Sequence, residues 1–155
     1  MDGSAMLPSG MAICCSLPDI LFLPELVSGG LVWILVACTY IVPNNPLAYV
    51  MAVSLFCFCI TFIWMIMFLC GAHHSRQSWA ASDVLYHGIA SVLYLSASVM
   101  LAYTTISTGY TYQNQTTDAL LKTYRLEISA VVFSFIATLL YVIHTLFSAI
   151  RWKNF

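Results

Sequence analysis

The sequence predicts an all-α membrane protein built as a bundle of four transmembrane helices. Residues 26–75, 84–117 and 128–150 contain no Asp, Glu, Lys or Arg. The composition is 61% hydrophobic and 7% charged, whereas a soluble domain carries about 25% charged residues. A bilayer core of about 30 Å is crossed by about 20 helical residues. The first uncharged stretch therefore holds two spans, and each of the others holds one.

The first helix is expected over residues 17–42, after an N-terminal tail of residues 1–16. Ser16, Pro18 and Asp19 favour a helix start here, because a Ser cap with an acidic residue three positions later satisfies free backbone amides. A tight turn is expected at 42–46, where two prolines and two asparagines supply bend chemistry.

The remaining elements follow from the same hydropathy and turn signals. Residues 17–153 form one domain, and the chain ends in a short tail, 151–155, which begins with the interfacial residues Arg151, Trp152 and Lys153. The elements are expected as helix 47–70, loop 71–82, helix 83–106, polar outer loop 107–127 and helix 128–150.

The orientation in the membrane depends on two weak signals that agree. Four spans place both termini on one side, and the basic residues on that side outnumber those opposite by only three to two. Asn114 starts an Asn-Gln-Thr triplet, which is an N-glycosylation acceptor that would place the 107–127 loop in the lumen. Both termini are then cytoplasmic. The alternative is that the triplet occurs by chance and is not modified.

None of the six cysteines lies in a predicted outer loop, which disfavours the four-span families whose outer loops carry disulfides. Cys14 and Cys15 occupy the juxtamembrane position expected for reversible acylation, and Cys70 is a weaker candidate. We expect the other three to be small apolar residues buried in the bundle: Cys38, Cys57 and Cys59.

Small side chains recur at helical spacing along three of the predicted helices. In lipid, helix association depends on close backbone approach, which small residues permit. They either hold the helices of one molecule together, which we favour, or face a second molecule or ordered lipid. The residues are Gly29 and Gly30; Gly88, Ser91, Ser98 and Ala102; and Ala130, Ser134 and Thr138.

Glu25, His87 and His144 are the ionisable residues expected inside the membrane at similar depth. An intramembrane ionisable residue is a functional hypothesis by default, and these three could relay protons. The alternative, which we favour, is a structural hydrogen-bonded cluster, or a Glu25 that is protonated or reaches the interface. His73 and His74 are expected in a solvated loop rather than at a metal site, because adjacent residues diverge and no Cys or acidic ligand lies near.

The sequence contains no recognisable catalytic constellation, metal-ligand set or cofactor motif. No nucleophile is paired with a base, and no phosphate-binding loop is present. The formal net charge is −1, without a run of Lys or Arg. This excludes nucleic-acid binding, which needs a basic patch.

Four blocks of sequence, in order, resemble the myelin and lymphocyte protein (MAL) family, which are proteolipids of the MARVEL-domain group. The blocks are residues 29–37 (GGLVWILVA); Trp79 with Asp83, Tyr86 and His87; residues 93–99 (LYLSASV); and residues 130–142 (AVVFSFIATLLYV) continuing to Lys153. The longer 107–127 segment and the ending Asn154-Phe155 depart from the shortest members. No sorting signal at the C-terminus is therefore carried over.

The resemblance implies a four-helix MARVEL fold with cytoplasmic termini and no catalytic residues. It also implies residence in cholesterol- and sphingolipid-rich membrane, in apical or raft-like plasma membrane and in Golgi or endosomal vesicles. The expected partners are these lipids, membrane cargo proteins and further copies of the chain.

We therefore predict a non-enzymatic, membrane-organising proteolipid that supports vesicle trafficking, apical sorting or myelin-type membrane formation. The alternative from another class is a small ion or proton channel or carrier that uses Glu25, His87 and His144. The chain lacks the internal repeat that many transporters show.

Overall fold

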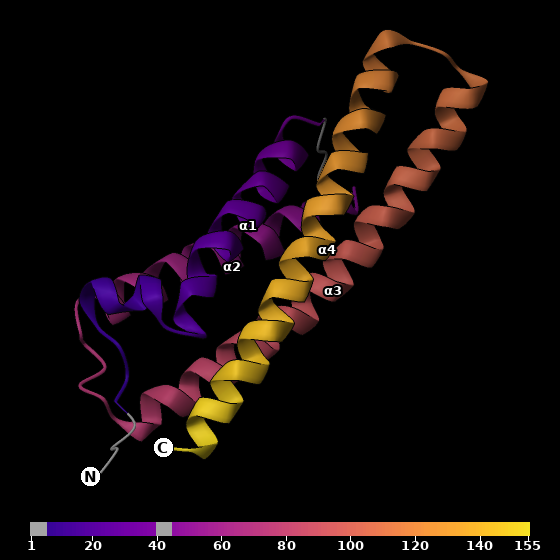
Figure 1. Cartoon of the computed structure of the whole chain (residues 1–155). Coiled ribbons are helices and arrows are strands. Elements are labelled where there is room, and N and C mark those ends of the chain that lie inside the picture. The colour runs from indigo at the N-terminus through magenta and orange to yellow at the C-terminus, as the bar shows by residue number, and fades with distance from the viewer. Residues whose placement is uncertain (1–5, 40–44) are drawn as a thin grey trace.

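A computed structural model describes residues 6–39 and 45–155 and contains four long α-helices (Figure 1). Each is long and apolar enough to cross a membrane, the first when counted from Asp19. No strand occurs in the described ranges. The predicted all-α bundle of four spans is thus confirmed, although residues 42–44 of the expected 42–46 turn lie outside the described residues. The helices are α1 Phe22–Ala37, α2 Leu47–Leu69, α3 Gln77–Asn114 and α4 Asp118–Lys153.

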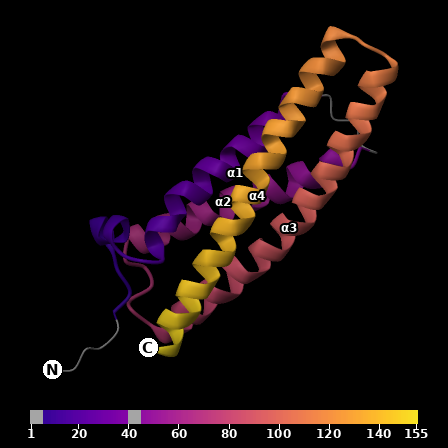
Figure 2. The ribbon, with the colours of Figure 1, turned by 45° about the vertical axis from the view of Figure 1, so that its right-hand side comes forward.

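The helices pack so that each contacts the neighbours before and after it in sequence, and α1 also contacts α4. The two longest helices, α3 and α4, form an antiparallel pair that continues beyond α1 and α2 (Figures 1 and 2). Phe155 packs in the same apolar cluster as Leu7 and Ile13. We call this the terminal end of the bundle, and the opposite tip the hairpin end.

The expectation of a polar outer loop over 107–127 is wrong. The third helix continues to Asn114, and the fourth begins at Asp118 behind Thr117, whose side chain accepts a hydrogen bond from the Leu120 amide. Polar composition suggested a loop, but a helix outside the hydrocarbon needs only one apolar face. With 38 residues, α3 is about 57 Å long. It also starts before the predicted residue 83, at Gln77.

The N-terminal segment folds back onto the terminal end of the bundle. Residues Gly10–Cys15 and Asp19–Leu21 form two 3₁₀ helices, η1 and η2, so that α1 begins later than the predicted residue 17. Ser16 does not cap a helix as expected; its hydroxyl donates to the Asp19 carboxylate, which also accepts from Arg151 of α4. The prediction of a solvated His73 is also wrong. His73 is 2% exposed and donates a hydrogen bond to the Pro8 carbonyl, with 2.9 Å between the two atoms.

The core is made of small and aromatic side chains at helix contacts. Tyr94 and Tyr141 stack with ring centroids 5.4 Å apart. Ser98 of α3 lies 3.2 Å from Thr138 of α4, measured between hydroxyl oxygens. The other small residues singled out above are distributed as follows: Gly29, Gly30, Ala130 and Ser134 are buried, and Gly88, Ser91 and Ala102 are half-buried.

Only one of the three cysteines expected inside the bundle is buried. Cys57 packs in the core, whereas Cys38 and Cys59 are exposed. Their thiols are small and weakly polar, and hydrocarbon chains are as apolar as the protein core, so they gain little from burial.

We expect Gly29→Ala to destabilise the bundle, because a Cβ there would lie 2.9 Å from the hydroxyl oxygen of the buried Tyr94. Overpacking of this kind costs about 1–3 kcal/mol. Gly88→Ala is the matched control, because its Cβ would meet Thr145 at an ordinary 3.7 Å. Thermal unfolding in detergent compares the two variants with the unmodified chain. Equal melting temperatures for all three would contradict the tight contact.

Candidate functional site

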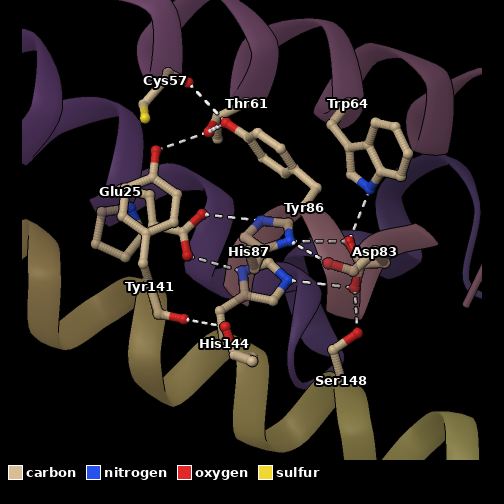
Figure 3. A network of polar contacts seen from close by, with 12 residues as sticks. Glu25, Cys57, Thr61, Trp64, Asp83, Tyr86, His87, Tyr141, His144 and Ser148 are labelled. Carbon is tan, nitrogen blue, oxygen red and sulfur yellow. Dashed lines mark hydrogen bonds and ion pairs between the residues drawn. The ribbon is translucent and has the colours of Figure 1, made fainter. Parts of the chain in front are cut away.

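Two stacked histidine rings lie between two carboxylates inside the bundle (Figure 3). The rings of His87 and His144 have centroids 3.6 Å apart and planes inclined by 18°. Glu25 of α1 lies on one side of the stack, and Asp83 of α3 lies on the other. All four side chains are fully buried. Three of the four helices therefore contribute to one closed group.

Each ring faces one carboxylate with each of its nitrogens. Glu25 Oε1 lies 2.8 Å from His144 Nδ1, and Glu25 Oε2 lies 3.6 Å from His87 Nε2. Asp83 Oδ1 lies 3.2 Å from His87 Nδ1, and Asp83 Oδ2 lies 3.6 Å from His144 Nε2. His87 Nδ1 also lies 2.9 Å from the Asp83 backbone carbonyl, which can only accept, so this nitrogen carries a proton.

Arg151 joins this group to the N-terminal segment. Its Nη1 lies 2.7 Å from Asp19 Oδ2, and its Nη2 lies 3.0 Å from Asp83 Oδ2. Asp83 also accepts hydrogen bonds from Ser148 of α4 and from the indole nitrogen of Trp64 of α2, the latter at 2.7 Å. One carboxylate thus connects three helices directly, and it reaches η2 through the guanidinium.

Aromatic side chains enclose the two imidazoles. Phe22 packs against both rings, at centroid distances of 5.6 Å from His87 and 4.9 Å from His144. Tyr86 and Tyr141 lie against His87, and the Thr61 hydroxyl holds both phenols at 2.8 and 2.7 Å. The polar group is consequently surrounded by apolar ring faces.

The charges in this group do not cancel when both imidazoles are neutral. The group contains three buried carboxylates, those of Asp19, Glu25 and Asp83, and one guanidinium, that of Arg151, which pairs with Asp19 and Asp83. An uncompensated buried charge is strongly destabilising. Two more positive charges are needed to balance the group.

The structure brings together Glu25, His87 and His144, as their similar depth had indicated. Sequence reasoning missed Asp83, taken as a helix start, and Arg151, taken as an interfacial stop. The helical spacing of these residues could have indicated that they share a face with the histidines. Asp83 and His87 are four residues apart, while His144, Ser148 and Arg151 follow the i, i+4, i+7 spacing of one helical face.

The remaining predicted sites lie at opposite ends of the molecule. Cys14 and Cys15 are exposed on η1 at the terminal end, and Cys70 is exposed just after α2. Asn114 is the exposed last residue of α3 at the hairpin end. Acylation of the cysteines and glycosylation of Asn114 stay predictions.

Comparison with known proteins gives matches along nearly the whole chain. The family model for MARVEL, described as a membrane-associating domain, matches residues 13–147. Myelin and lymphocyte protein of Canis lupus familiaris is 46% identical over 155 residues, covering 99% of this chain and 95% of the relative. The Homo sapiens protein of that name is 46% identical over 154 residues, covering 98% of this chain and 95% of the relative.

A more distant relative is plasmolipin of Danio rerio, which is 30% identical over 148 residues. That match covers 93% of this chain and 77% of plasmolipin. No solved structure matches the chain.

We expect Arg151→Met to destabilise the protein, because it leaves Asp19 and Asp83 buried without their counter-charge. Breaking a buried ion pair from one side costs about 3–5 kcal/mol. Lys153→Met, at an exposed position on the same helix, should change little. Thermal unfolding in detergent tests both variants, and adding Asp19→Asn to Arg151→Met should restore part of the loss. Equal stability of the Arg151 and Lys153 variants would contradict this role.

Proposed function

The chain belongs to the MARVEL-domain membrane proteolipids, within the myelin and lymphocyte protein family, and from this premise we propose that it organises cholesterol- and sphingolipid-rich membrane. The observation that carries the proposal is the length of its uncharged helices. The 23 residues of α2 correspond to about 35 Å, which exceeds a hydrocarbon core of about 30 Å. Residues 84–106 of α3, which precede its polar end, form another uncharged helical stretch of similar length.

A long apolar span favours thicker, ordered bilayer because hydrophobic mismatch costs fractions of a kcal/mol per Å. The exposed side chains along the helices are large and apolar, such as Val92 and Val99 on α3 and Phe135 and Leu139 on α4. Self-association multiplies a small preference per copy. Clusters of the protein then collect matching lipids and membrane cargo for vesicle trafficking, apical sorting or myelin-type membrane formation.

We place the protein in apical or raft-like plasma membrane and in Golgi or endosomal vesicles, with both termini cytoplasmic. The shared location of Leu7, Ile13 and Phe155 at the terminal end supports an even number of spans. We also propose that the protein acts without enzymatic activity. The aromatic enclosure of the histidine group supports this, because it leaves that group fully buried.

The burial pattern favours an organiser over the alternative of a proton or ion conduit. Between the histidine group and the hairpin end, buried apolar residues such as Val36, Leu101 and Ala130 lie among hydroxyls that donate to carbonyls of their own helices, as in Ser98 and Thr138. A proton pathway would need polar groups or water at these positions. Proton flux into liposomes that is lost on Glu25→Gln would instead favour the conduit.

We expect the double variant Cys14→Ser, Cys15→Ser to leave ordered membrane domains, because it removes the anchors for acyl chains. Two lipid chains add strong membrane affinity at about 0.8 kcal/mol per buried CH₂. Partition is measured by fluorescence in phase-separated giant vesicles drawn from expressing cells. Cys59→Ser, which changes an exposed thiol on α2, is the matched control. An unchanged partition of the double variant would count against the lipid anchors.

Asn114 is expected to carry a glycan on the lumenal side of the membrane. The exposed Asn114 ends α3 at the hairpin end, where the helix is long enough to extend beyond the hydrocarbon. Glycosidase treatment of protein made in cells should therefore increase its electrophoretic mobility. Thr116→Ala should abolish that shift, whereas Thr117→Ala should preserve it. A wild-type chain whose mobility does not change would remove the support for this orientation.

A further inference from the structure

Glu25, His87 and His144 present three metal-type donor atoms that all lie within 4.8 Å of one another. We propose that these residues bind a divalent transition-metal ion, with Zn²⁺ as the best match, inside the bundle. One carboxylate and two imidazoles form a donor set that zinc uses in proteins. Because the three ligands come from α1, α3 and α4, the ion would join three helices.

Two of the unpartnered atoms in this group point to a cation. Glu25 Oε2 and His87 Nε2 are buried without a hydrogen-bond partner and face each other at 3.6 Å. Since His87 Nδ1 holds a proton against the Asp83 carbonyl, Nε2 of the neutral ring is a bare lone pair directed at a carboxylate. A cation between the two atoms satisfies both. Two ligands of one tetrahedral zinc ion lie about 3.3 Å apart, which is close to the observed separation.

Asp83 occupies the outer position that zinc-binding histidines require. It faces the second nitrogen of both rings, at 3.2 Å from His87 Nδ1 and 3.6 Å from His144 Nε2. A carboxylate in that place fixes the tautomer and raises the basicity of the ligand nitrogen. To act as a ligand through Nδ1, His144 would carry its proton on Nε2, which faces Asp83.

The charge of the group also matches a divalent ion. With both rings neutral, the three carboxylates of Asp19, Glu25 and Asp83 exceed Arg151 by two negative charges. One Zn²⁺ cancels this excess and leaves the imidazoles in the neutral form that ligates metal. Two protons would also cancel the excess of two negative charges. They would do so only by placing a positive charge on each of two rings whose centroids are 3.6 Å apart, where like charges repel.

A small cavity at the terminal end lies next to the site. Its volume is about 240 Å³, and its lining includes Cys14, Asp19 and Phe22. Phe22 contacts both histidine rings with its own ring. Phe22 therefore contacts the cavity on one side and the proposed ligands on the other.

The test uses the full chain, purified in detergent and treated with a chelator. Titration with Zn²⁺ in a calorimeter should give one ion per chain, and Co²⁺ should produce the visible absorption bands of a tetrahedral site. Glu25→Gln and His144→Gln should each lower the affinity at least tenfold, and Asp83→Asn should lower it by about 10–100-fold. The control His74→Gln, at an exposed histidine, should bind like the unmodified chain.

Further variants exclude other sources of binding and guard against misfolding. The Cys14→Ser, Cys15→Ser variant should keep the cobalt spectrum, because the proposed ligands contain no thiol. Circular dichroism establishes that each variant is folded; should Glu25→Gln fail to fold, His87→Gln and His144→Gln carry the comparison. Absence of stoichiometric zinc binding overturns the proposal, because protons alone would then balance the charge of the site. Binding that survives loss of Glu25 or His144, or that disappears with the cysteines, overturns it as well.

Discussion

Arg151 pairs with two buried carboxylates from separate segments of the chain, and the terminal half of the bundle depends on that contact. Its guanidinium reaches Asp19 of η2 and Asp83 of α3 from the last turns of α4. Without water, each of these charges must find its partner within the protein. The Asp83 carboxylate also contacts both histidine rings, and both rings contact the Glu25 carboxylate on their other side. The apolar helices pack here around this network of ion pairs and hydrogen bonds.

The fold class could be predicted from sequence because a bilayer span needs only a sufficiently long run of apolar residues. Long stretches without charge, such as 26–75, have few alternatives to membrane spans. Helix ends outside the hydrocarbon were less accessible to such reasoning. Hydropathy does not distinguish a polar loop from a polar-faced helix, so 107–127 was misassigned although Thr117 and Asp118 form a recognisable helix start. The N-terminal segment was misassigned for a related reason, since burial of Leu7 and Ile13 depends on distant residues.

The candidate site could be predicted only in part. The sequence predicts a similar membrane depth for Glu25, His87 and His144, but depth alone does not say which way a side chain points. It could not show that Asp83 and Arg151 point inwards as well, because a charge near a helix end can equally reach the interface. The facing of Glu25 Oε2 and His87 Nε2 depends on side-chain rotamers, and no spacing along the chain encodes a donor set drawn from three separate helices.

The order of the partners along the chain has a consequence for biosynthesis. Asp19 and Glu25 belong to the first segment to be synthesised, whereas Arg151 and His144 lie 132 and 119 residues further on. During translation, the first span therefore reaches the lipid with two acids whose counterparts have not yet been made. Its final placement must wait for the last helix. A chain truncated before α4 would keep those acids exposed to lipid, a lesion that cellular quality control can recognise.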